Sequence, residues 1–205
     1  PVSRLKPKPL EWLDRAFVAG RVVAGRVEVT GPARGFPYRA GEGRFVADAR
    51  VEGLTLEYAQ GWPAAEALAL DARFEGPGFS VAGASGRLAG VRVVSASAEL
   101  ADWRDSLLLV RADAEGDAGD VHRLLAESPL GPSLGETFAR LEAAGPLAGE
   151  AVLVLPLKQL SDRVVTVRAA GRGRYLGIAG LAEGVTDLAG ELTVRNTELY
   201  APSLT

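Results

Sequence analysis

The sequence predicts a mainly β protein built as an antiparallel meander, and three observations support this fold class. Apolar and polar residues alternate with a two-residue period over long stretches, which is typical of strands with one solvated face. These stretches recur at a spacing of roughly 8 to 12 residues and are separated by turn signals. The 205 residues include 25 Gly and 12 Pro, enough to punctuate many short elements.

The alternation is clearest between Gly43 and Leu100. Its phase slips by one residue at Glu52-Gly53, which indicates a turn or a bulge that returns the apolar row to its original face. The sequence therefore predicts successive strands that all present their apolar residues to one side. We expect these strands at about 44–51, 54–60, 66–75, 78–83, 86–100 and 106–113.

The two ends of the chain extend this plan. Residues 1–19, which begin basic and Pro-rich, are expected to form a linker or edge segment with a short helical turn in its second half. Residues 20–205 are expected to form one β segment. Its first strand is predicted at about 21–30, and the meander is predicted to resume at 165–169, 175–181 and 192–194. The first residue is Pro, so we expect the chain to be a segment of a longer protein.

A helical hairpin is predicted at about 117–144. Helical spacing of apolar residues follows Asp117 and stops at Pro129, and Ser133 with Glu136 forms a capping box for a second helix that ends near Gly145. The flanking strands at 107–110 and 150–157 are apolar on both faces and need cover on both sides. We therefore expect the hairpin to lie over these two strands.

Composition and motifs argue against several classes of function. The formal net charge is -3 and no basic stripe is present, which argues against nucleic acid as a partner. With one His and no Cys, neither a zinc site nor thiolate chemistry is expected. The acidic run from Asp113 to Asp120 lacks the Gly and Glu that a calcium loop requires, since Ala118 and Leu124 occupy those positions.

The remaining candidate motifs have simple structural interpretations. Gly171-Arg172-Gly173 lacks the third glycine of a dinucleotide-binding loop and is interpreted as a hairpin turn. His122 has no neighbouring nucleophile or orienting acid in the pattern and is interpreted as a surface residue. Trp62-Pro63 and Trp103 are interpreted as turn residues that cap strand ends. No catalytic residue, metal or cofactor is expected, and the chain is predicted not to be an enzyme.

The order of elements resembles that of a known family. The stretch from Phe36 to Val81 contains strand, strand, Gly61-Trp62-Pro63 and strand, and it is followed by a helix ending in Ser128-Pro129-Leu130. A G-x-L-x-G motif and an apolar strand ending at Pro156 come next. This arrangement is similar to the YhdP family, which belongs to the AsmA-like group together with TamB. The resemblance covers about residues 20 to 200.

The resemblance implies a strongly curved antiparallel sheet that forms an open hydrophobic groove. It further implies a segment of an inner-membrane-anchored protein that bridges the periplasm and moves phospholipid toward the outer membrane, as part of outer-membrane biogenesis. The anchoring helix and most of the family's length are absent from these residues. The implied partners are phospholipid acyl chains, adjoining segments of the same longer chain, and the inner membrane through a segment not included here.

The apolar face can be hidden in two ways. A groove leaves it for acyl chains, whose burial contributes about 0.8 kcal/mol per CH₂. The alternative is a closed β-sandwich that acts as a spacer or a protein-docking module. For the groove, the candidate lipid-contacting residues are Phe45, Val51, Leu54, Leu56, Tyr58, Leu68, Leu70, Phe74, Phe79, Val81, Val165, Val167, Leu192 and Val194.

Overall fold

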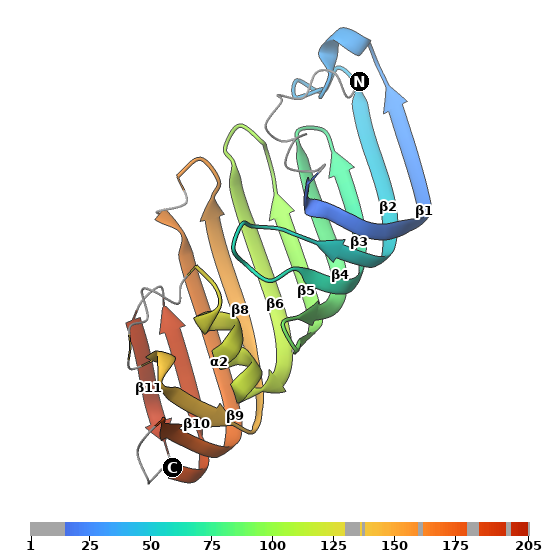
Figure 1. Cartoon of the computed structure of the whole chain (residues 1–205). Coiled ribbons are helices and arrows are strands. Elements are labelled where there is room, and N and C mark those ends of the chain that lie inside the picture. The colour runs from blue at the N-terminus through green and yellow to red at the C-terminus, as the bar shows by residue number, and fades with distance from the viewer. Residues whose placement is uncertain are drawn as a thin grey trace.

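The protein forms one open antiparallel sheet. The computed structural model describes residues 15–129, 136, 138–159, 162–179, 185–195 and 198–204. Sheet order follows chain order from β1 to β6 and from β8 to β11, with β6 paired to β8 and the short β7 paired to β9 (Figure 1). The strands are β1 (Phe17–Thr30), β2 (Arg44–Leu56), β3 (Ala65–Glu75), β4 (Gly78–Leu88), β5 (Val91–Leu100), β6 (Leu107–Asp117), β7 (Leu141–Ala144), β8 (Pro146–Pro156), β9 (Val164–Ile178), β10 (Val185–Arg195) and β11 (Glu198–Leu204).

This topology confirms the predicted mainly β meander. Because β1 and β11 end the strand order and do not pair with each other, the sheet is not closed. All described strands belong to this single sheet, so the alternative of a two-sheet sandwich is wrong. The helical elements whose full bounds lie within the described residues are the 3₁₀ turn η2 (Ala33–Gly35) and the helix α2 (Ala118–Ala126).

The register places the alternating residues on two chemically distinct faces. On the apolar face, Val51 lies opposite Leu70, and Phe79 lies opposite Leu100. On the polar face, charged residues of adjacent strands form ion pairs, as between Arg50 Nε and Asp71 Oδ1 at 2.8 Å. Apolar pairs on one face and pairs of opposite charge on the other both stabilise an antiparallel ladder. The alternation in the sequence therefore specifies this register.

Bulges bend the strands in the first half of the sheet. The phase slip predicted at Gly53 is a bulge inside β2, where Gly53 has a φ of 61° and the register shifts between Val51 and Leu54. β4 has a similar shift beside Gly83, whose φ is 59°. Each bulge inserts a residue and bends its strand, and Figure 1 shows the lower parts of β1 to β4 turned away from their upper parts.

Two expected boundaries between strands are wrong. Residues 54–56 continue β2 through the bulge, so the predicted strand at 54–60 is not a separate element. The predicted strand at 86–100 is instead divided by a two-residue turn, since Leu88 pairs with Val91 across Ala89 and Gly90. Ala89 and Gly90 have φ values of 47° and 89°, the left-handed conformations that tight hairpins require.

The helical hairpin is only partly confirmed. Its first helix is α2, whereas Leu141–Ala144 form strand β7 where the second helix was expected to continue. Glu136 and Phe138 are helical, and residues 130–135 and 137 lie outside the described residues. α2 contacts β7 and the adjacent end of β6. The doubly apolar part of β6 begins at the opposite end of that strand, where Leu107 is 50% exposed, so α2 does not provide the expected cover there. Cover by the second helix stays a prediction.

The boundaries near the ends of the chain also differ from expectation. β1 starts at Phe17, four residues before the predicted start, and so enters the segment interpreted as a linker. Residues 175–178 belong to β9, which continues without a break from Val164, so the expected separate strand there is wrong. Residues 1–14 lie outside the described residues.

A small core lies on the apolar face where β2 and β3 bend. Val51, Leu54 and Leu68 form its buried centre, and Ala49 and Leu70 are among the partly buried residues packed against it. On the opposite face of the same strands, charged residues such as Arg50 and Asp71 stay exposed. The bend therefore folds the apolar face inward, and the concave side of the sheet is its apolar side.

Candidate functional site

Apolar residues form continuous rows across the concave face. One row runs through six consecutive strands of the sheet in register, from β3 to β9, and consists of Ala72, Val81, Ala98, Val110, Leu153 and Val165. The next row contains Ala84, Ala96, Ala112, Ala151 and Val167. Because the rows run perpendicular to the strands, they define an apolar track along the length of the sheet. No charged residue occupies a position in these two rows.

Much of this apolar face is not covered by protein. Buried apolar residues on it cluster in β2 to β5, and none of the described residues of β6 and β8 is buried. Phe74 of β3 remains 37% exposed, and Val27 of β1 is 68% exposed. A closed core would bury such side chains, since apolar surface is removed from water wherever a partner surface exists. The sheet thus forms an open groove.

The predicted lipid-contacting residues fall into several groups. Phe45, Leu56, Leu70, Phe74, Phe79, Val81, Val165 and Val167 are at least partly exposed on the apolar face. Val51, Leu54 and Leu68 are buried in the core, where they offer little surface to a ligand. The strand β10 places Leu192 opposite Ala169 and Val194 opposite Val167, and the side chains of Leu192 and Val194 lie outside the described residues.

Tyr58 does not belong to the row in which it was predicted. It follows the end of β2, in the loop 57–64, where its ring lies 6.3 Å from that of Trp62. Burial raises the pKa of the Tyr58 phenol to about 12, because the phenolate would lose its hydration there. The amide of Glu57 also donates to Ala16 O at 2.8 Å, which ties the start of this loop to the chain before β1.

One rim of the groove is aromatic. Phe79 stacks on Trp103 with 5.3 Å between ring centroids and lies 6.0 Å from Phe74. Phe36 meets Phe45 edge to face at 5.2 Å. We call these five residues the aromatic rim. Trp103 and Phe36 lie in loops outside the alternating pattern, which is why the sequence did not identify them as groove residues.

An ion pair joins the two loops that carry Phe36 and Trp103. Arg39 Nε and Nη2 donate to the two carboxylate oxygens of Asp102 at 3.0 and 2.9 Å, and the amide of Arg104 donates to Asp102 Oδ1 at 2.7 Å. The hydrogen bond from Arg39 holds the pKa of Asp102 well below its usual range. A bidentate pair fixes both loops in one geometry, and it links segments 63 residues apart in sequence.

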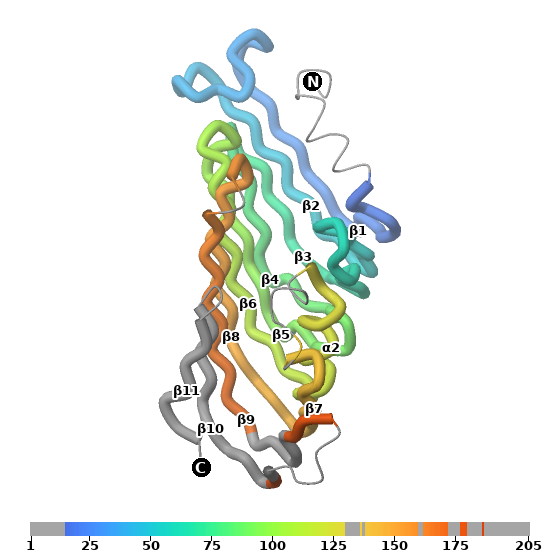
Figure 2. Tube along the Cα trace, turned by 60° about the vertical axis from the view of Figure 1, so that its left-hand side comes forward, coloured from blue at the N-terminus to red at the C-terminus, as the bar shows by residue number. Residues whose placement is uncertain are grey.

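The opposite rim is formed by a loop and a helix. In both views the loop 57–64 and α2 lie on the same side of the sheet, toward which the lower parts of the strands bend (Figures 1 and 2). The two elements also meet: a side chain at Gly61 would begin 3.1 Å from Cγ of Pro129, three residues after the end of α2. We call residues 57–64 and 118–129 together the helical rim.

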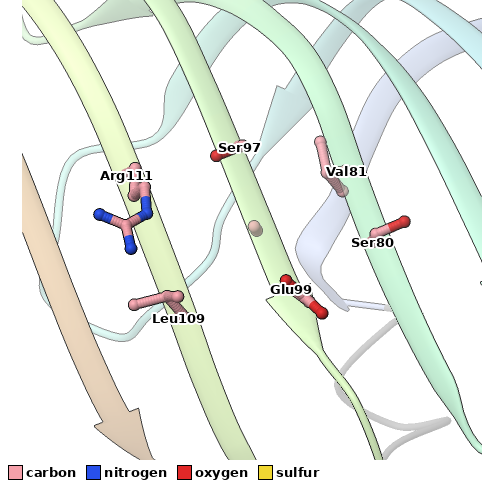
Figure 3. A pocket seen from close by; sticks show the side chains of 7 residues that line it. Ser80, Val81, Ser97, Glu99, Leu109 and Arg111 are labelled. Atoms are coloured by element: carbon pink, nitrogen blue, oxygen red, sulfur yellow. The ribbon is translucent and has the colours of Figure 1, made fainter.

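The polar face carries a shallow pocket. Its lining comes from β4, β5 and β6, with the side chains of Ser80, Ser97, Glu99 and Arg111 among those drawn in Figure 3, and its volume is about 130 Å³. Elsewhere on this face, ion pairs such as that between Arg168 and Glu150 at 3.0 Å cross between strands. This face therefore presents charge to solvent and is separate from the groove.

The described residues show no constellation for metal binding. Within them, no group of three or more His, Asp or Glu side chains is arranged to hold a metal ion. His122 Nε2 lies 2.8 Å from the carbonyl of Phe138, to which it donates, and its ring packs against Phe138 at 4.8 Å. A helix long and apolar enough to cross a membrane is likewise not found in the described part of the chain.

These features define a β-groove protein, an open sheet whose concave apolar face is bounded by two rims. The YhdP protein family model matches residues 1–205, and the chain belongs to this family. The chain is 26% identical over 198 residues to the intermembrane phospholipid transporter YhdP of Escherichia coli strain K12. That match covers 96% of this chain and 15% of the length of the relative. No solved structure matches the chain.

Proposed function

We propose that this chain is a non-catalytic section of a lipid conduit, in which the concave face holds the acyl chains of phospholipids while their headgroups stay in water. The observation that supports this most is the continuous apolar face that a single open sheet leaves uncovered. Exposed apolar patches of this extent mark interaction sites, because uncovered apolar surface costs free energy in water. Ten strands of the main order at ~4.8 Å each give a track on the order of 45 Å long.

Membership of the family supports a wider role. The curated relative is an intermembrane phospholipid transporter, which supports phospholipid as the ligand and the cell envelope as the setting. In this proposal the chain lies in the periplasm as part of a longer protein anchored in the inner membrane. Its groove would continue into adjoining segments and carry phospholipid toward the outer membrane. β1 and β11 end the strand order of the described residues, and strands of adjoining segments would pair with the outer backbone groups of these edge strands.

Lipid retention tests this proposal. The purified chain is incubated with phosphatidylethanolamine vesicles and separated from them, and the bound lipid is extracted and measured by mass spectrometry. We expect at least one phospholipid per chain. Absence of retained lipid from a folded chain would refute the proposal.

Two matched valine substitutions localise the binding. Val110→Asp places a carboxylate on the apolar face of β6, whereas Val152→Asp places one on the polar face of the neighbouring β8, opposite Arg111. We expect Val110→Asp to reduce the retained lipid at least fivefold and Val152→Asp to leave it unchanged. Equal effects of both substitutions would show that lipid does not bind in the groove.

A further inference from the structure

One carboxylate beside the aromatic rim holds two arginine side chains. Asp102 lies in the loop between β5 and β6, and Arg39 lies in the loop between β1 and β2. Arg39 donates to both oxygens of Asp102, and Arg104 donates from Nε and Nη2 to Asp102 Oδ2 at 3.1 and 3.0 Å. Both guanidinium groups therefore turn the same edge toward one carboxylate, which holds them next to each other.

The loops that carry this cluster lie at one end of the sheet. In an antiparallel meander the connections after β1, β3, β5 and β8 share an end, and Figure 1 shows them at the upper ends of the strands. The aromatic rim is at this end too, since Trp103 precedes Arg104 in the chain and stacks on Phe79 of β4. Cationic and aromatic side chains thus meet where the apolar groove borders water.

The loop of Asp102 is fixed by hydrogen bonds on both sides. The amide of Trp103 donates to Pro77 O at 3.0 Å, and the hydroxyl of Ser106 donates to Trp103 O at 2.6 Å. The amide of Leu157 donates to Ser106 O at 2.7 Å, which joins the loop to the end of β8. A site whose groups are already held in place loses little conformational entropy when a ligand binds.

The two arginines keep unused donors and positive charge. A guanidinium carries five N–H donors, and the contacts of the described residues use two on Arg39 and two on Arg104. The side chain of Arg104 is 70% exposed and that of Asp102 only 14%, so a ligand in solvent can reach the donors while the carboxylate is mostly covered. The ammonium of Lys158 also donates to the carbonyl of Arg104. With Asp105 as the other acid of this loop, three cations stand against two carboxylates.

The link between the two loops explains the position of Arg39 but not that of Arg104. Arg104 is two residues from Asp102, so its pairing joins no distant segments of the chain. Exposed ion pairs of this kind contribute little to stability. A second guanidinium beside the first is instead what an anion with several acceptor oxygens requires.

We propose that Arg39 and Arg104 form a headgroup site, which binds the phosphate of a phospholipid whose acyl chains lie in the groove beside the aromatic rim. It rests on the proposed function, because the acyl chains must occupy the groove. A phosphodiester shares one negative charge between two non-bridging oxygens, so each guanidinium can donate to one of them. The rings of the aromatic rim contact the apolar part of the same lipid, as aromatic side chains do where apolar surface borders water.

Competition between two lipids with the same acyl chains tests the headgroup site. The chain is incubated with vesicles that contain dioleoyl phosphatidylethanolamine and dioleoylglycerol, which lacks the phosphate, and the retained lipids are measured by mass spectrometry. We expect Arg104→Gln to lower the retained ratio of phospholipid to diacylglycerol at least fivefold relative to the parent chain. Comparing this ratio between proteins cancels the different ease with which the two lipids leave the vesicle, and the ratio does not depend on the folded fraction.

Two further variants separate phosphate binding from other effects of a lost arginine. Arg39→Gln should lower the ratio as Arg104→Gln does, whereas Arg168→Gln, which removes an exposed and paired arginine of the polar face, should leave it unchanged. An unchanged ratio in either Arg39→Gln or Arg104→Gln, or an equal loss in Arg168→Gln, would overturn the headgroup site, and the retained lipid would still support the proposed function. Retention of neither lipid by the folded parent chain would overturn both.

Glycerophosphoethanolamine, the same headgroup without acyl chains, distinguishes a lipid site from a site for a soluble phosphate ester. It is added to the competition assay at the concentration of the phospholipid. We expect the retained ratio to stay within twofold of its value without this compound, because burial of the acyl chains adds to the binding of the intact lipid. Loss of the preference for phospholipid at this concentration would assign the two arginines to a soluble phosphate ester and overturn the headgroup site.

Discussion

Two leucines on the same apolar face should respond differently to truncation, because one is covered by protein and the other borders the open groove. Leu54 is 2% exposed and belongs to the core of β2 and β3. Leu153 lies on the apolar face of β8 and is only partly buried. Leu54→Ala removes fully buried methyl groups and leaves a cavity, at a cost of about 3 kcal/mol. Leu153→Ala removes a partly solvated side chain, at a cost of about 1 kcal/mol.

Urea unfolding followed by far-ultraviolet circular dichroism measures this difference. With a denaturant slope of about 2.5 kcal/mol per molar, Leu54→Ala should lower the midpoint by about 1.2 M and Leu153→Ala by about 0.4 M. The two variants delete the same atoms, so the comparison reports on cover alone. Equal losses near 3 kcal/mol would mean that the face of β8 is as tightly packed as the core of β2, and the open groove would be refuted.

Three further predictions concern Gly53, Asp117 and Tyr58. Gly53 has a φ of 61°, and a Cβ added there would meet no atom within 4 Å. Gly53→Val should therefore destabilise the chain by about 1–2 kcal/mol through backbone strain alone, and Gly53→Asn should destabilise it by less. Thermal unfolding of both variants and of the parent chain checks this, and equal stability of the three proteins would contradict it. Asp117→Ala removes the acceptor of the Gly119 and Gly145 amides and should destabilise the start of α2 by about 2 kcal/mol. Limited proteolysis should then cut near α2 first, whereas cutting as slow as in the parent chain would show that the start of α2 does not depend on this carboxylate. Because the pKa of Tyr58 is raised to about 12 in the folded chain and lies near 10 when unfolded, its contribution to stability is complete below pH 10 and is lost as the pH rises toward 12. Tyr58→Phe should reduce the loss of stability over that range, measured by urea unfolding at each pH, and an unchanged alkaline dependence would exclude this cause.

The alternation of residue types allowed the faces of the sheet to be predicted, because a strand has a period of two and each phase error would expose an apolar row. The bulge at Gly53 was predictable for the same reason, since the phase visibly slips there. The turn at Ala89-Gly90 was missed because Ala is a weak signal for a left-handed position, compared with Asn or Asp before Gly. Local pattern thus predicts faces better than strand ends.

The cover of the apolar face could not be predicted, because it depends on contacts between distant segments. Leu141–Ala144 match a helical stripe in sequence, yet β9 extends beyond the end of β8 and offers a free edge with which they pair as β7. The burial of Leu54 depends on the bend that several bulges produce together. The meeting of Gly61 and Pro129, 68 positions apart in the chain, leaves no trace in local periodicity.

Site-specific photocrosslinking along β6 tests the central claim most directly. A photoreactive residue is placed in turn at positions 109 to 114, and the chain is irradiated after loading with phosphatidylethanolamine. On the apolar face these positions are Val110, Ala112 and Ala114, and the three between and beside them belong to the polar face. The groove account predicts lipid adducts at 110, 112 and 114 and at least fivefold fewer at 109, 111 and 113. Adducts without this two-residue period, or confined to the polar face, would contradict a lipid-holding groove.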